Sequence, residues 1–166
     1  MHSIVDEYEK AKDIPDIFEV VKRAVRETIG KERAGLMLGL ADLGGSREYL
    51  IGAFYPIGTN IIVMNKTPLH RIKQTDPSLL KPYIFNILLH EYLHSLGLYD
   101  ETTTQKKVQQ ISNRVFGKKH IVADIAADIK KYVPNMTHPM NIWKPSKEQK
   151  IEIVQGFDKG NCVYIA

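Results

Sequence analysis

The chain has 166 residues, of which 43% are hydrophobic and 25% are charged, and its formal net charge is +4. This length predicts one domain, and the proportions of apolar and charged residues exclude a largely disordered chain. No apolar run reaches the roughly 18–20 residues of a membrane-spanning helix, and the first residues lack the basic and apolar regions of a signal peptide. We therefore expect a single soluble domain over residues 1–166, located in the cytoplasm.

The first part of the chain predicts one helix followed by three short strands. Apolar residues recur at helical spacing from Ile14 to Ile29, and Gly30 follows where a helix often ends. Residues 34–43, 49–55 and 61–64 are short apolar segments separated by turn residues, which is typical of strands. The region of about 14–65 therefore predicts a small mixed sheet with a helix packed on one face.

A long helical stretch follows at about 77–97. Asp76 and Pro77 form an N-cap followed by a proline in the first turn, and Gly97 ends the stretch. Pro82 lies inside it, so we expect a kink or a new helix start at that position.

The C-terminal part, about 100–166, predicts more helices and an irregular tail. Two helices are expected at about 102–116 and 120–133, and the chain finishes in a strand-like segment at 162–165. The order of elements predicts an α+β fold: a helix and strands come first, then a long helix, then a helical C-terminal half.

The long predicted helix carries a metal-binding pattern. His90 and His94 are four residues apart, so on a helix their imidazoles lie on one face and can bind a single zinc ion. Glu91 can reach the coordination position that zinc leaves for water or substrate. Zinc lowers the pKa of that water toward ~7, and a carboxylate that accepts the released proton makes hydroxide available to attack a carbonyl. The chain has one cysteine, so this site depends on nitrogen and oxygen ligands.

These residues, His-Glu-Tyr-Leu-His, resemble the active-site helix of the zincin metallopeptidases, whose motif is His-Glu-x-x-His. The continuation through Gly97 to Asp100 is similar to the longer metzincin motif, in which a glycine turns the chain and a third ligand, usually histidine, returns to the metal. The resemblance covers about residues 50–133 in layout. It implies a zincin-like fold with the sheet packed on the active-site helix. It also implies a zinc metallopeptidase, acting on a peptide or protein substrate, in which Glu91 is the general base.

The third zinc ligand has two candidates. Asp100 stands at the position of the metzincin ligand, and a carboxylate oxygen binds zinc well, although Asp100 can instead cap the next helix. His120, with Asp124 as its hydrogen-bonding partner, is the alternative, because a ligand from a downstream helix is similar to the gluzincin arrangement. Gluzincins normally use glutamate there, but Glu101 is too near His94 in the sequence for that geometry.

The zincin resemblance implies further features around the site. A strand along the substrate cleft precedes the active-site helix in zincins, and Thr59–Asn65 is expected to be that edge strand, with an ordinary core strand as the alternative. Met136 or Met140 could form a methionine-containing turn beneath the metal. Cys162, on the tail, could place a thiolate in the open zinc position, although a small packed side chain is the simpler interpretation.

Two other functions remain open. A metal-dependent endoribonuclease with a related helix agrees with the basic net charge, but such a nuclease has no need of Glu91. The second open function is that of a non-catalytic binding protein with a zincin fold. The lysines and arginines are scattered and form no long basic run, so neither nucleic acid nor a membrane is an expected partner.

Overall fold

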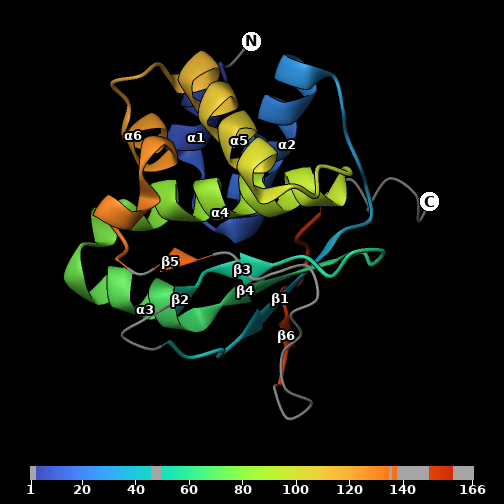
Figure 1. Cartoon of the computed structure of the whole chain (residues 1–166), viewed down its shortest axis with the longest axis vertical. Coiled ribbons are helices and arrows are strands. Elements are labelled where there is room, and N and C mark those ends of the chain that lie inside the picture. The colour runs from blue at the N-terminus through green and yellow to red at the C-terminus, as the bar shows by residue number, and fades with distance from the viewer. Residues whose placement is uncertain (1–2, 46–49, 135, 138–149, 159–166) are drawn as a thin grey trace.

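The computed structural model describes residues 3–45, 50–134, 136–137 and 150–158, which form an α+β fold. Helices cover one face of a small sheet, and helix α4 crosses between the other helices and the strands (Figure 1). The helical elements are α1 (Ile4–Lys10), α2 (Ile14–Ile29), α3 (Lys66–Thr75), η1 (Pro77–Leu79), α4 (Leu80–Ser95), α5 (Glu101–Phe116), α6 (Ile121–Ala127) and η2 (Ile129–Lys131). The strands are β1 (Met37–Ala41), β2 (Leu50–Ile51), β3 (Ala53–Phe54), β4 (Ile61–Asn65), β5 (Met136–Thr137) and β6 (Glu152–Ile153).

Helix α2 confirms the first predicted helix at both ends. Asp13 caps its start by accepting a hydrogen bond from the backbone N–H of Asp16, and Gly30 ends it with a φ of 69°. Helix α1 was not predicted, because seven residues are too few for a clear apolar period.

The strands form a sheet of order β3-β4-β1-β6. β1 is parallel to β4, whereas β3 and β6 are antiparallel to their neighbours. A separate parallel pair joins β2 to β5. The expectation that Thr59–Asn65 forms the edge strand is wrong, because β4 is hydrogen-bonded on both sides. Residues 53–54 fold back beside β4 as a hairpin, so β3 is the edge strand on that side of the described sheet.

Helix α4 begins where a new start was expected. Asp76 caps η1 by accepting from the N–H of Ser78, and α4 then begins at Leu80 with Pro82 in its first turn. A proline is tolerated there because first-turn N–H groups have no partner within the helix. The preceding helix α3 was not predicted, since its sequence is mostly polar, and Asn65 caps it.

The predicted C-terminal helices are present, but the second is shorter than expected. Helix α5 matches the prediction of 102–116 closely. Helix α6 ends at Ala127 instead of near Val133, because Asp128 leaves the helical conformation with a φ of −157°.

Helix α4 is the centre of the molecule. All its residues from Pro82 to Ser95 are buried, and it packs against α2, α5 and α6 as well as against β3. A helix that is apolar on nearly every side must be covered on every side, which explains its position between the two layers. The predicted zinc-binding residues therefore lie on a helix that is buried over nearly its whole length.

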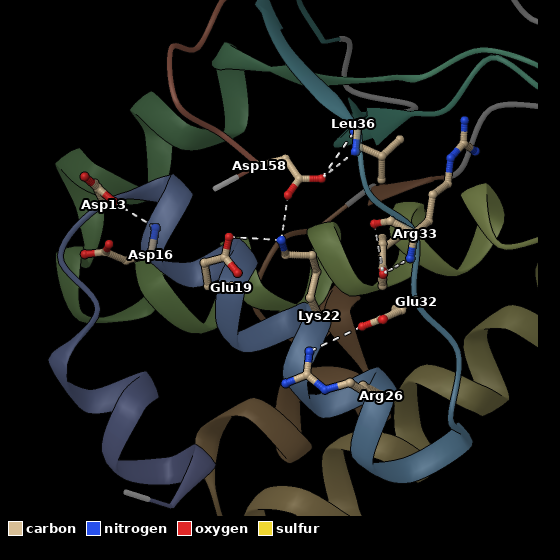
Figure 2. Close-up of polar contacts among 11 residues, drawn as sticks. Asp13, Asp16, Glu19, Lys22, Arg26, Glu32, Arg33, Leu36 and Asp158 are labelled. Carbon is tan, nitrogen blue, oxygen red and sulfur yellow. Dashed lines mark hydrogen bonds and ion pairs between the residues drawn. The ribbon is translucent and has the colours of Figure 1, made fainter. Parts of the chain in front are cut away.

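A buried carboxylate joins the C-terminal segment to α2 (Figure 2). Asp158 has a fully buried side chain, and it accepts hydrogen bonds from the Lys22 ammonium at 2.6 Å and from the backbone N–H groups of Gly35 and Leu36 at 2.9 and 3.3 Å. Next to it, Phe157 stacks on Phe18 with 4.0 Å between the ring centroids. Residues 157–158 thus belong to the core.

Some expectations concern residues outside the described ranges. These are Met140, Cys162 and the strand-like segment at 162–165. Met136 is described, and it lies buried in β5 with its sulfur against Gly52. Among the described residues, no helix combines the length and the apolar character needed to cross a membrane.

Candidate metal centre

The structure brings His90, Glu91 and His94 together near the C-terminal end of α4. The two imidazole rings lie 4.7 Å apart, and His90 and His94 are only 2% and 7% exposed. One potential ligand atom from each of these residues and from Glu91 lies within 4.8 Å of the others. The i and i+4 spacing therefore produces the cluster that the sequence predicts.

A backbone carbonyl orients His94. Its Nδ1 lies 2.6 Å from the carbonyl oxygen of Leu98, in the turn after α4, so Nδ1–H donates to that oxygen. This hydrogen bond leaves Nε2 as the atom that can bind a metal, which is the usual arrangement of a histidine ligand.

Glu101, the first residue of α5, places its carboxylate against both imidazoles. Its Oε2 lies 2.8 Å from Nε2 of His90, and its Oε1 lies 2.8 Å from Nε2 of His94. The short sequence separation from His94 argues against Glu101 as a gluzincin-type ligand, yet the Glu101 carboxylate reaches both histidines. Helix α4 ends at Ser95, and Gly97, with a φ of 104°, lets the chain reverse so that α5 begins beside the histidines.

Asp100 does not face the histidines. Its Oδ2 accepts hydrogen bonds from the N–H and the hydroxyl of Thr103, both at 2.7 Å, so it is the N-cap of α5. These hydrogen bonds lower the pKa of the Asp100 carboxyl. Of the two roles weighed for this residue, the structure places it in the capping role, and the neighbouring Glu101 contacts the histidines instead.

His120 is also placed away from the metal cluster. It caps α6 through Nδ1, which accepts from the N–H of Val122 at 3.1 Å, and its ring packs against Tyr8 and Phe116. The expected partner of His120, Asp124, instead accepts a hydrogen bond from Tyr132. The His120–Asp124 alternative for the third ligand is therefore wrong in its geometry.

The cluster holds the carboxylate of Glu101 between the imidazoles of His90 and His94. Burial alone would raise the pKa of Glu101, but hydrogen bonds from His90 and His94 hold it well below its usual range. Burial opposes the charged form of His94, yet its hydrogen bond to Glu101 raises its pKa. Both ring nitrogens of His94 face acceptors, which requires the doubly protonated ring. A divalent cation can replace the proton on each Nε2 that faces Glu101, since two imidazole nitrogens and a carboxylate are a ligand set that zinc accepts.

Glu91 has a different environment from Glu101. It is 3% exposed, and its Oε2 has no hydrogen-bond partner among the described residues. Burial raises the pKa of its carboxyl, and the neighbouring histidines only partly oppose that shift. A buried carboxylate oxygen without a partner destabilises the fold, and groups of this kind are frequent at functional sites.

Arg33 holds the end of α4 against the sheet, a role that the sequence did not suggest. Its guanidinium donates to the carbonyl oxygens of Ser95 and Thr59, both at 2.9 Å, and to the hydroxyl of Tyr55 at 3.0 Å. Its backbone N–H donates to the hydroxyl of Tyr92 at 2.8 Å. These contacts fix the residues beside His94, but one arginine in a loop carries no sequence signal of such a role.

No protein-family model matches the chain, and neither the comparison with curated proteins nor the comparison with solved structures found a match.

Proposed function

We propose that this protein is a zinc-dependent peptidase with a zincin-like fold. His90, His94 and Glu101 hold the metal, and Glu91 is the general base. The observation that carries the proposal is the convergence of the Glu101 carboxylate on both Nε2 atoms, beside a buried carboxylate oxygen of Glu91 that has no partner. The two features have different chemical uses, because the first suits metal binding and the second suits proton transfer.

The ligand set supports a catalytic rather than a purely structural zinc. Structural zinc sites usually have four protein ligands, whereas catalytic sites have three and leave one position for water or substrate. Two histidines and a glutamate would provide three protein ligands and leave the fourth position open. The side chain of Glu101 is 37% exposed, so the cluster has a side that faces solvent.

A zinc ion held by these residues would act as a Lewis acid, which polarises a substrate carbonyl and makes water more acidic. Glu91 takes a proton from the attacking water and then gives it to the nitrogen of the leaving amine. Burial raises the pKa of the Glu91 carboxyl, which makes it a stronger proton acceptor than an exposed glutamate. The hydrogen bond from His94 to Leu98 holds one ligand in place during these transfers.

The sheet offers a surface for an extended peptide. Within the described residues, β3 is an edge strand antiparallel to β4, and it packs against α4. An edge strand can bind a peptide main chain by adding it to the sheet. This supports a peptide substrate.

The test is Glu91→Gln in the full chain loaded with zinc. We expect one zinc per chain to remain bound and cleavage of a peptide mixture, followed by mass spectrometry, to fall at least about a hundredfold, because general base catalysis is removed. Glu32→Gln, at an exposed surface ion pair with Arg26, is the matched control and should retain activity.

Three results would contradict the proposal. Unchanged peptide cleavage in Glu91→Gln would remove Glu91 from the mechanism. Chelator-sensitive cleavage of RNA without cleavage of peptides would favour the nuclease. Purified protein that binds no zinc would favour a non-catalytic binding protein.

A further inference from the structure

A cavity of about 370 Å³ lies between the start of α2, helix α3 and the start of α4. It involves none of the residues of the metal centre. Figure 1 shows α3 beside the end of α4 where this helix begins, whereas the histidines lie toward the other end. Its size falls within the range of small-molecule sites. Its apolar lining consists of Ile14, Ile17, Leu69, Leu80 and Ile84.

The wall of the cavity is apolar and rigid at its base. Ile17 and Ile84 are 4% and 5% exposed, and each comes from a long helix of the core. Ile14, Leu69 and Leu80 are partly buried and complete the wall. An apolar chain bound there would leave water, at about 0.8 kcal/mol per buried CH₂ group.

The rim of the cavity is basic. Lys12, Lys73 and Lys81 lie there, together with His70 and one acidic residue, Asp13. The ammonium of Lys81 already donates to the backbone carbonyls of Tyr8 and Glu9.

The single acid at the rim does not neutralise these lysines. The carboxylate of Asp13 accepts the N–H of Asp16 and caps α2. Among the residues that the structure describes, Lys12 and Lys73 form no ion pair. Two ammonium groups at the mouth of an apolar cavity are thus available to an anion.

We propose that this cavity binds an amphipathic carboxylate, a molecule with one medium-length apolar chain and a terminal carboxylate group, of the fatty acid class. The chain occupies the space between Ile17, Leu69 and Ile84, and the carboxylate pairs with Lys12 and Lys73. Charge complementarity selects an anion over a cation or a neutral alcohol, and the apolar wall selects a hydrocarbon chain over a small polar anion such as phosphate. This inference does not depend on the proposed peptidase activity.

The test is a titration of the zinc-free full chain with decanoate below its micelle concentration, followed by two-dimensional ¹H–¹⁵N NMR. We expect saturable shifts of the amides of Ile14, Leu69 and Ile84. The double variant Lys12→Gln/Lys73→Gln should bind about tenfold more weakly, because two ion pairs are lost. The control Lys118→Gln/Lys119→Gln removes the same charge from an exposed turn elsewhere and should bind as the unchanged chain does.

Two further probes test the apolar wall of the cavity and the charge at its rim separately. Leu69→Trp, which fills the cavity, should abolish the shifts, and decyltrimethylammonium, with the same chain and the opposite charge, should not bind there. If Leu69→Trp does not fold, the exposed lysine variants still decide the question.

The proposal is overturned if decanoate causes no saturable shift at the cavity, or if both lysine pairs affect binding equally. It is also overturned if the ammonium compound binds as well as decanoate. Binding of an acidic peptide at this face without binding of decanoate would overturn it in favour of a protein partner.

Discussion

At the scale of single residues, two adjacent acids have different roles. Asp100 caps α5 through Thr103, whereas Glu101 turns its carboxylate to His90 and His94. The difference follows from their positions, because an N-cap side chain bends back over the first turn of its helix while the side chain of the next residue can leave the helix axis.

The proposed zinc site predicts that substitutions of these two acids change the zinc affinity by different amounts. Glu101→Gln should weaken zinc binding at least about a hundredfold, since it replaces a charged ligand with a neutral amide. Asp100→Asn is the matched control, and it should keep the affinity within about threefold because asparagine is also a good N-cap. Competition with a chromophoric chelator measures the zinc affinity of both variants. Loss of zinc in Asp100→Asn with retention in Glu101→Gln would return the ligand role to Asp100.

The cluster of His90, Glu91 and His94 was predictable from the sequence, whereas the contact of Glu101 with both histidines was not. A spacing of four residues on one helix determines where His90 and His94 lie relative to each other. Glu101 belongs to a different helix, so its position depends on the turn at Gly97 and on how α5 packs against α4.

At the scale of elements, a buried ion pair joins α2 to the C-terminal segment, beside the stacked rings of Phe18 and Phe157. Asp158 accepts from Lys22 and from two backbone N–H groups that precede β1. Figure 2 shows the Lys22 ammonium between Asp158 and Glu19, which it contacts at 3.0 Å. The buried carboxylate thus joins three segments that are distant in sequence.

Asp158→Asn should lower the free energy of unfolding by about 2–4 kcal/mol, because it removes the charge that compensates the buried ammonium of Lys22. Urea denaturation followed by circular dichroism measures the change. Glu152→Gln is the control, since Glu152 pairs with Lys66 on the surface and its loss should cost less than about 1 kcal/mol. Equal effects of the two substitutions would show that the Asp158 contacts contribute little.

Helices with regular apolar spacing and clear caps were predictable, and those without were not. The sequence predicts α2 and α5 nearly to the residue, because each has an apolar face and a terminal glycine. Helices α1 and α3 are short or polar, and their stability comes from the core against which they pack.

At the scale of the whole molecule, the C-terminal segment completes the core. Phe157 is 2% exposed and stacks on Phe18, beside the fully buried side chain of Asp158. A chain that ends before Phe157 therefore tests folding as well as any effect of Cys162 on the metal centre.

Two shortened chains separate these effects. The chain that ends at Asp158 should be more stable than the chain that ends at Gly156 by about 4 kcal/mol or more, because the second lacks a buried aromatic ring and a buried ion pair. Denaturant titration compares them directly. Both lack Cys162, so only the longer of the two should be compared with the full chain for activity. A rise in its activity would support inhibition by the Cys162 thiolate, and equal activity would exclude it.

The sequence by itself determined the α+β composition and the helix that carries His90, Glu91 and His94, because apolar periodicity, caps and i, i+4 spacing act within a few residues. Tertiary structure decided that β4 lies inside the sheet, that α4 is buried on all sides, and that Glu101 rather than Asp100 meets the histidines. Each of these depends on segments that are brought together by hydrogen bonding between strands or by burial of apolar faces, and such contacts between separate elements leave no local pattern in the chain.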